Sequence, residues 1–352
     1  MIEKLVRKNI LNLRPYTSAR DMYSKGILLD ANENSLGTTA EGYDDLELNR
    51  YPDPHQDDLK YIVGRYYGVD PKNLFFGVGS DEIIDLLIRI FCDPGKDSVM
   101  ILEPTYGMYK VACDINNVET VNVDLNEEFQ IDFGAVEKGY KPNVKIIFLC
   151  SPNNPTGNLL KREDVLKLCS TYNCIVAVDE AYVDFAGDNS FIKDTGEFEN
   201  LVVLRTFSKA WGLAGIRLGY CIAGEEIIQL LFKVKAPYNV SSLTRLAVIQ
   251  AIANTRKKEE FISKLISERE RVKEELKQLP GVLKVYDSDA NYLLFKCKDA
   301  SEVQKKMAEE GVVIRDRSSY QMLENCLRVS IGTEKENDQF IEGLKKQLCT
   351  KL

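Results

Sequence analysis

Residues 174–179 read Cys-Ile-Val-Ala-Val-Asp, and residues 201–205 read Leu-Val-Val-Leu-Arg. Both runs are short, apolar and rich in β-branched residues, which is typical of buried strands. Such runs alternate with segments of helical spacing, such as 81–91 and 162–169, and this alternation favours an α/β sheet with helices on its faces. The expected strands are 74–76, 98–102, 120–123, 145–149, 175–179, 201–205 and 219–223, most of them parallel. Because parallel strands end at one edge of a sheet, we expect ligands at that edge.

The length of the chain, 352 residues, exceeds what a single core usually supports, so we expect two domains. After Pro237 the pattern changes to charged amphipathic helices at 244–257 and 259–278. Further strands are expected at 282–286, 292–296, 312–315 and 327–331, with helices at 301–310 and 334–348. We therefore expect a large α/β domain at 39–240 with a mostly parallel seven-stranded sheet and a smaller α+β domain at 241–352. Residues 1–38 are expected to form an N-terminal arm, or part of the small domain, that packs on something else such as a neighbouring subunit.

The composition is that of an ordinary soluble globular protein, with 44% hydrophobic and 28% charged residues. No apolar stretch is long enough to span a bilayer, and the charged N-terminus argues against a signal peptide. We therefore expect a cytoplasmic protein with no membrane partner. The net charge of −8 argues against nucleic acid as a partner.

The sequence offers few ligands for a Cys/His metal site and no second histidine for a catalytic triad, because His55 is the only histidine and no Cys-x-x-Cys pair occurs. Several of the nine cysteines, including Cys150, Cys174 and Cys221, lie in apolar strand-like runs, so we expect reduced, buried thiols.

Polar residues at the ends of the expected strands suit an electron-sink cofactor such as pyridoxal phosphate. Such a cofactor needs an amine for covalent attachment, an acid at its ring nitrogen, donors near its phenolic oxygen and a phosphate cradle. Lys209, in Ser208-Lys209-Ala210, supplies the amine, and Asp179 supplies the acid. The alternative for Lys209 is a solvated surface lysine, and for Asp179 a helix or loop cap.

Donors for the phenolic oxygen and the phosphate follow from the same reasoning. Asn154 and Tyr182 are donors of the right type, although each alone is more often a turn asparagine or a packed tyrosine. The turn 77–82, with Gly79, Ser80 and Asp81, leads from a strand into a helix, where backbone N–H groups bind anions. Ser208 and Arg217 would complete the cradle, and Tyr106 is expected to stack on the ring or to be a plain core tyrosine.

Three motifs together carry a specific resemblance. They are Ser-Pro-Asn-Asn-Pro-Thr-Gly at 151–157, Asp-Glu-Ala-Tyr at 179–182 and Thr-Phe-Ser-Lys-Ala at 206–210. On these motifs the chain resembles, over nearly its full length, the fold type I pyridoxal-phosphate aminotransferases. A narrower resemblance to histidinol-phosphate aminotransferases rests on Leu-Arg-Pro-Tyr at 13–16, Asn-Glu-Asn at 32–34, Arg-Tyr-Pro-Asp at 50–53, Pro-Thr-Tyr-Gly-Met-Tyr at 104–109 and Leu-Arg-Val-Ser-Ile-Gly-Thr at 327–333.

This resemblance implies a homodimer that interconverts L-histidinol phosphate plus 2-oxoglutarate and imidazole-acetol phosphate plus L-glutamate, a step of histidine biosynthesis. It implies that Lys209, Asp179 and Tyr182 are catalytic, that Thr206 joins the cofactor-binding residues, and that Tyr51 reaches the cofactor phosphate of the other subunit. It also implies substrate contacts for Arg328, Arg315, Tyr16 and Asn154. The alternatives are an aromatic or broad-specificity aminotransferase, a decarboxylase of the phosphothreonine type, and a non-catalytic cofactor-binding regulator.

Overall fold

The computed structural model describes residues 1–15, 31–43 and 46–349, and it contains two sheets. The larger sheet has seven strands in the order β1-β7-β6-β5-β4-β2-β3. The strands are β1 (Leu74–Val78), β2 (Ser98–Glu103), β3 (Glu119–Asp124), β4 (Val144–Cys150), β5 (Ile175–Asp179), β6 (Leu201–Thr206) and β7 (Leu218–Ala223). All seven expected strands are therefore present, with boundaries within two residues of the predicted ones.

One strand of the large sheet runs against the others. The pairs β2–β3, β2–β4, β4–β5 and β5–β6 are parallel, whereas β7 is antiparallel to both β1 and β6. Six strands thus end at one edge of the sheet, and β7 begins at that edge. The connection between β6 and β7 leaves and re-enters the sheet at the same place, so residues 207–217 stay beside the ends of the parallel strands.

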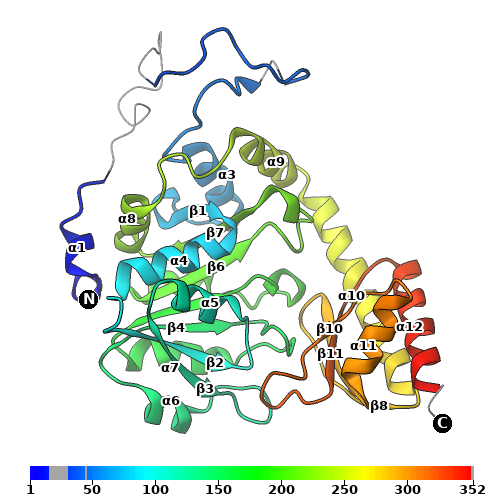
Figure 1. Cartoon of the computed structure of the whole chain (residues 1–352). Coiled ribbons are helices and arrows are strands. Elements are labelled where there is room, and N and C mark those ends of the chain that lie inside the picture. The colour runs from blue at the N-terminus through cyan, green and yellow to red at the C-terminus, as the bar shows by residue number, and fades with distance from the viewer. Residues whose placement is uncertain (16–30, 44–45, 350–352) are drawn as a thin grey trace.

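Helices cover both faces of the large sheet (Figure 1), because its strands are apolar on both sides. Helices α4 (Gly79–Phe91), α5 (Met108–Ile115) and α8 (Glu225–Val234) pack on one face. Helices α6 (Phe133–Gly139) and α7 (Arg162–Thr171) pack on the other, where α3 (Asp57–Tyr67) and α9 (Ser242–Ile252) also lie, over β1 and β7.

The smaller sheet has four antiparallel strands in the order β10-β11-β9-β8. The strands are β8 (Val282–Val285), β9 (Tyr292–Cys297), β10 (Arg315–Asp316) and β11 (Cys326–Ser330), and the helices are α10 (Thr255–Gln278), α11 (Ala300–Glu309) and α12 (Glu334–Cys349). One face of this sheet, with Leu293, Phe295, Leu327 and Val329, forms a core with the helices. Leu294 and Cys326 point the other way and join the core of the large sheet.

Several boundaries differ from the sequence prediction, among them the break between the helices expected at 244–257 and 259–278, which lies at residues 253–254. Residues 1–11 do not stand apart, because Ile2, Leu5, Val6 and Ile10 are buried in the core of the large sheet and Arg7 pairs with Asp93 at 3.0 Å. Helix α9 packs on α3 in the large unit, so the large unit continues past residue 240. Strand β10 begins three residues later than predicted, because the turn at Gly311 (φ +91°) leaves Val313 exposed.

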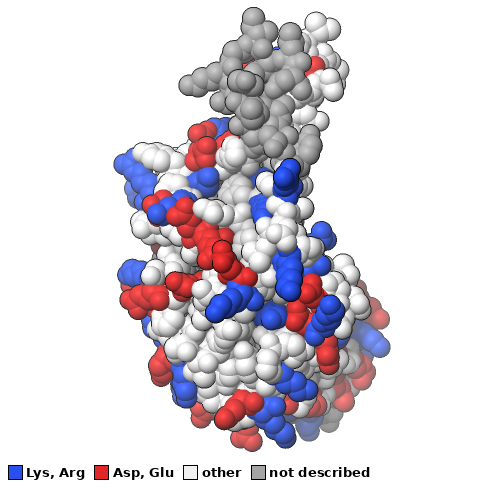
Figure 2. Space-filling model, turned by 90° about the vertical axis from the view of Figure 1, so that its left-hand side faces the viewer, with Lys and Arg blue, Asp and Glu red and all other residues white. Residues whose placement is uncertain are grey.

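Two surface properties complete the description. Acidic and basic side chains are interspersed over the face of the body shown in Figure 2. Within the ranges that the structure describes, no helix is both long enough and apolar enough to cross a membrane.

Candidate active site

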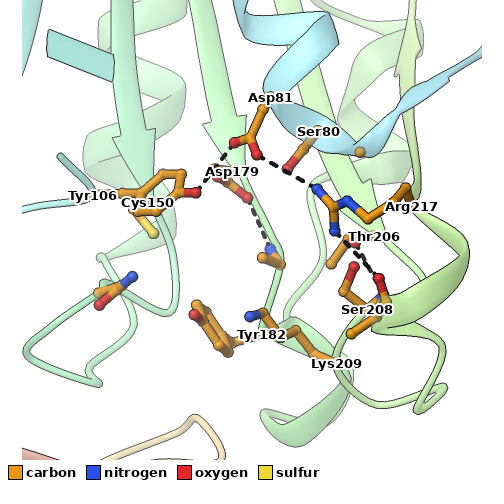
Figure 3. Close-up of a pocket in the computed structure, with 14 residues that line it drawn as sticks. Ser80, Asp81, Tyr106, Cys150, Asp179, Tyr182, Thr206, Ser208, Lys209 and Arg217 are labelled. Carbon is orange, nitrogen blue, oxygen red and sulfur yellow. Dashed lines mark hydrogen bonds and ion pairs between the residues drawn. The ribbon is translucent and has the colours of Figure 1, made fainter. Parts of the chain in front are cut away.

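A pocket opens at the edge where the parallel strands end (Figure 3), and it gathers most of the residues singled out from the sequence. Those that line it are Gly79, Ser80, Asp81, Tyr106, Asn154, Asp179, Tyr182, Thr206, Ser208, Lys209 and Arg217. Cys150, Ala181 and Ala214 complete the lining. Five different strand ends supply these side chains, so the topology of the sheet brings together residues that are up to 138 positions apart, from Gly79 to Arg217.

Asp179, the last residue of β5, is held in a fixed orientation. Its Oδ2 accepts a hydrogen bond from the Tyr109 hydroxyl at 3.1 Å, and its Oδ1 accepts one from the Ala181 N–H at 3.0 Å. Burial raises the pKa of the carboxyl to about 6, although the two hydrogen bonds oppose this. In the described part of the chain Asp179 forms no ion pair, so its anion is buried with no direct cationic partner.

Lys209 points into the same pocket, with its Nζ 5.4 Å from the centroid of the Tyr182 ring. Its side chain is accessible to solvent, because the pocket is open, yet the surrounding walls still desolvate the amine. This desolvation lowers the pKa of Lys209, and the nearby Arg328 guanidinium lowers it further, against the opposing charge of Asp179. Lys209 is therefore more easily deprotonated than a surface lysine.

An anion cradle lies at the other end of the pocket, where β1 leads into α4. Gly79 has φ +75°, and a Cβ atom placed on it would lie 2.8 Å from Nη2 of Arg217. The Gly79 N–H donates to the Arg217 carbonyl at 3.0 Å, no side chain caps the N-terminus of α4, and the absent Cβ leaves space beside Arg217 in front of the N–H groups that follow. Gly219 is required as well, because a Cβ there would lie 2.2 Å from the Ser80 nitrogen.

Hydrogen bonds fix the walls of this cradle. The Ser208 N–H donates to Oγ1 of Thr206 at 3.0 Å, so the Thr206 hydroxyl shapes the connection that carries Lys209. The Tyr106 hydroxyl donates to Oδ1 of Asp81 at 3.2 Å, while Oδ2 of Asp81 lies 3.7 Å from Arg217. The Tyr106 ring is thereby held against the pocket wall, edge-on to Tyr109.

Arg328 of β11 approaches the pocket from the small sheet. Its Nη1 donates to Oδ1 of Asn154, and its guanidinium lies 5.2 Å from the centroid of the Tyr292 ring. The Tyr292 hydroxyl in turn donates to the Asn153 carbonyl at 2.6 Å, which joins the two sheets beside the pocket. The sequence prediction for Arg328 and Asn154 thus concerns two residues in direct contact.

Arg315 and Tyr51, which were predicted as site residues, do not line the pocket. The Arg315 side chain is exposed, although Arg315 pairs with Arg328 across the strands β10 and β11. Tyr51 is half-exposed and stacks on Tyr238, with ring centroids 4.4 Å apart. Tyr16 lies outside the described residues.

Sequence reasoning missed Tyr109, which orients Asp179 and stacks on Phe148 with ring centroids 4.8 Å apart. The one signal was its place in the run Pro-Thr-Tyr-Gly-Met-Tyr at 104–109, which also holds Tyr106.

Sequence reasoning also missed a buried charge network directly behind the pocket. Arg205 contacts Glu180 at 3.2 Å and Asp184 at 3.0 Å, and Lys258 of α10 contacts Asp184 at 2.9 Å. All four side chains are at most 8% exposed. Glu180 follows Asp179 and Arg205 precedes Thr206, so this network fixes the backbone on which the pocket residues stand.

These groups fit pyridoxal phosphate. The buried Asp179 carboxylate has no ion-pair partner among the described residues and suits a protonated ring nitrogen, and the gap at Gly79 beside Arg217 suits a phosphate. Lys209 lines the same pocket and has a lowered pKa, which suits covalent attachment to an aldehyde.

Comparisons with known proteins agree with this chemistry. The family model for aminotransferase class I and II matches residues 24–344. A histidinol-phosphate aminotransferase from Cytophaga hutchinsonii is 45% identical over 346 residues, covering 98% of each chain.

Solved structures share the fold. The histidinol-phosphate aminotransferase from Clostridium acetobutylicum has a TM-score of 0.79 at 27% identity, covering 86% of this chain and 92% of that one. The enzyme from Sinorhizobium meliloti, solved in complex with pyridoxal-5'-phosphate, has a TM-score of 0.79 at 23% identity, covering 92% and 90%. The chain therefore belongs to the class I and II aminotransferases, within the group of histidinol-phosphate aminotransferases, and is a pyridoxal-phosphate-dependent enzyme of fold type I.

Proposed function

We propose that this protein transfers an amino group between L-histidinol phosphate plus 2-oxoglutarate and imidazole-acetol phosphate plus L-glutamate, as a step of histidine biosynthesis. The relationship to curated histidinol-phosphate aminotransferases over 98% of the chain supports this substrate pair. The single structural observation that carries the chemistry is the placement of the Lys209 amine and the buried Asp179 carboxylate in one pocket.

When bound, pyridoxal phosphate supplies an electrophilic carbon for the substrate amine and a ring that withdraws electrons from the substrate Cα. Lys209 would hold this carbon through Nζ and would be released when the amino donor binds. As a free amine, Nζ would then accept and return a proton at the substrate Cα, for which its lowered pKa suits it.

The other pocket residues hold and tune the cofactor. Asp179 would keep a proton on the ring nitrogen, because a buried carboxylate favours a cation beside it. Asn154 and Tyr182 line the pocket beside Lys209, where their polar groups suit the phenolic oxygen. Ser208, Arg217, Thr206 and the turn at Gly79, Ser80 and Asp81 would hold the phosphate, and Tyr106 would pack on the ring.

L-Histidinol phosphate and L-glutamate use the same pocket in turn, so one residue must anchor both donors. This residue must bind the phosphate of the first donor and a carboxylate of the second. Arg328 suits both, since its guanidinium can pair two oxygens of either anion. Its contact with Asn154 places it at the pocket edge, on the side of Tyr182. Tyr16 and Arg315 remain proposed contacts of the substrate end.

We further propose a homodimer, which the segment before α3 supports. Its described residues rise away from the body of the large sheet (Figure 1), with Leu36 98% exposed and Tyr51 50% exposed. A second copy of the chain would cover these apolar side chains and bring Tyr51 to the cofactor phosphate of the other subunit.

The proposed division into two domains follows the separate hydrophobic cores of the two sheets. We propose a large domain that includes the N-terminal helices and α9, and a small domain that begins with α10. We propose the cytoplasm as the site of action, which the free, buried cysteines of the described residues support.

The function is tested by adding L-histidinol phosphate to the purified holoenzyme and recording the cofactor absorbance. Conversion of the yellow form to the amine form, followed by glutamate production on addition of 2-oxoglutarate, is expected. Release of carbon dioxide from a phosphorylated amino acid would instead indicate a decarboxylase. A preference for aromatic amino acids over histidinol phosphate would indicate a broad-specificity aminotransferase.

A further inference from the structure

Helix α10 connects the core of the small sheet to the back of the active-site pocket. Its second half, with Val272, is part of the core of the small sheet. Its first half packs behind the pocket, where Ile262 lies in one cluster with Tyr182 and Ala210. Because Ala210 follows Lys209 in the chain, this single helix of 24 residues touches both segments that carry reactive side chains.

Lys258, on the first half of α10, is buried where these two segments meet. Its Nζ lies 2.9 Å from Oδ1 of Asp184 and 4.8 Å from the centroid of the Trp211 ring. It also donates a hydrogen bond to the Tyr66 hydroxyl at 3.2 Å. The side chain of Lys258 is only 6% exposed. An ammonium group that is held from several sides away from water has a fixed position, and it fixes the groups around it relative to each other.

Asp184 connects Lys258 to the backbone of Tyr182. A hydrogen bond of 3.1 Å from a backbone N–H to the Tyr182 carbonyl closes the Tyr182 turn, residues 182–185. Arg205 contacts the same oxygen of Asp184 as Lys258, at 3.0 Å. Burial opposes the ionisation of Asp184, yet the two cations hold the pKa of its carboxyl below the usual value. The Tyr182 turn is therefore tied to Lys258 by a permanent charge.

Trp211 connects Lys258 to the backbone of Lys209. A hydrogen bond of 3.0 Å from the Gly212 N–H to the Lys209 carbonyl closes the Lys209 turn, residues 209–212. An ammonium group over the face of an indole is attracted by the negative face of the ring, most strongly where water is excluded. Trp211 is buried, so this attraction acts on the turn that carries Lys209.

The two turns direct their side chains into the same cavity (Figure 3), where Nζ of Lys209 lies 5.4 Å from the centroid of the Tyr182 ring. After burial, the charges that act most strongly on the pKa of Lys209 are those of Arg328 and Asp179. Lys258 lies behind the wall and does not line the pocket. Its influence on Lys209 therefore acts through position rather than through charge.

We propose that Lys258 is a positioning residue of this aminotransferase, whose ammonium group joins the Tyr182 turn to the Lys209 turn and so sets the place of the reactive amine beside Tyr182. The inference rests on the proposed function, in which Lys209 moves a proton and Tyr182 faces the phenolic oxygen of the cofactor. It goes beyond that function, because it assigns the alignment of these two groups to a residue that touches neither cofactor nor substrate.

The first test uses the fluorescence of the cofactor-free protein. Trp211 is the only tryptophan of the chain, so its emission reports on the Lys209 turn directly. We expect Asp184→Asn, a change in the Tyr182 turn, to shift this emission, because asparagine no longer holds the Lys258 ammonium by charge. In a Lys258→Met background the same change should have no further effect. Equal shifts in both backgrounds would show that the two turns are not joined through Lys258.

The second test titrates the absorbance of the covalently attached cofactor with pH in the holoenzyme. Misalignment should weaken the hydrogen bond from Tyr182 to the phenolic oxygen, so Lys258→Met should raise the midpoint by roughly half a pH unit or more. We expect kcat to fall roughly 10-fold while KM changes less than about threefold. Lys258→Arg should recover most of both losses, because a guanidinium can pair with Asp184 and stack on Trp211. The exposed Lys257→Met is the control and should match the wild type.

Loss of stability is separated from loss of position by recording every spectrum under conditions in which urea titration shows the variant to be folded. If Lys258→Met gives no folded holoenzyme, Lys258→Gln takes its place, because its amide still donates to Asp184 but carries no charge for the Trp211 ring. An unchanged midpoint and an unchanged kcat in the folded variant would overturn the proposal.

The proposed substrates can fail independently of this inference. If the wild-type holoenzyme does not turn over L-histidinol phosphate, the proposed function fails. The fluorescence and the pH titration need no substrate, so they still decide whether Lys258 aligns Lys209 with Tyr182.

Discussion

Replacement of Asp179 by asparagine isolates the energetic cost of a buried carboxylate in the cofactor-free protein. Asparagine has nearly the same shape, so its carbonyl can still accept the Ala181 N–H, and its amide still faces the Tyr109 hydroxyl. The substitution therefore removes a negative charge with little change in packing. We expect the Asp179→Asn apoprotein to be more stable than the wild-type apoprotein at pH 8.

The magnitude follows from the shift in pKa. Burial raises the pKa of Asp179 from 3.8 to about 6. Each unit is worth about 1.36 kcal/mol, so the ionised carboxylate costs the folded apoprotein roughly 3 kcal/mol. Between about pH 4 and pH 6 the folded state holds a proton that the unfolded state has released. The stability contributed by this proton is present at low pH and is lost as the pH rises through about 6.

The assay is urea unfolding of both cofactor-free proteins at one protein concentration, at pH 5 and pH 8. We expect the advantage of Asp179→Asn to be largest above pH 7 and about half as large at pH 5. A difference that is the same at both pH values would refute the reasoning, because it would arise from packing rather than charge. In the holoenzyme the order should reverse, since only aspartate can hold the protonated ring nitrogen, and retention of pyridoxal phosphate on a desalting column checks this.

Four further outcomes are expected. Lys209→Ala should abolish both turnover and the absorbance of the covalently attached cofactor, and retention of either would contradict its role. Arg328→Gln should raise KM for histidinol phosphate and for glutamate, each roughly 10- to 100-fold, as steady-state kinetics would show; an effect on neither would exclude it as the shared anchor. Lys258→Met should lower the unfolding free energy by roughly 3 kcal/mol in urea, because it deprives the buried Asp184 of one of its two cations; the exposed Lys257→Met serves as its control, and equal losses would argue against the network. Leu36→Glu should shift a dimer toward monomer in analytical ultracentrifugation, because it charges an apolar side chain that is 98% exposed in the single chain; an unchanged mass would remove this segment from the interface.

Much of the large domain could be predicted from the sequence, because its strands are short apolar runs with clear ends. Residues 174–179 illustrate this, since a single acid closes a run of β-branched residues and marks both the end of β5 and the pocket. The direction of β7 could not be read in the same way. Its residues are as apolar as those of its neighbours, and direction depends on the long connection before it rather than on its own pattern.

The residues that sequence reasoning missed act through partners that are distant in the chain. Arg205 is a charged residue in an apolar strand, and the Asp184 carboxylate that it contacts is shared with Lys258, which lies on a helix 53 positions after Arg205.

The way in which β6 and β7 are joined constrains how this enzyme can be redesigned. Lys209 and Arg217 lie on one connection, residues 207–217, which leaves and re-enters the sheet at the same edge. No crossover lies between the two residues that could absorb a change in the length of the chain. Inserting or deleting residues there would move one group relative to the other. New termini for a circular permutant, or a grafted peptide, are better placed at the turn near Asp188, whose side chain is 92% exposed.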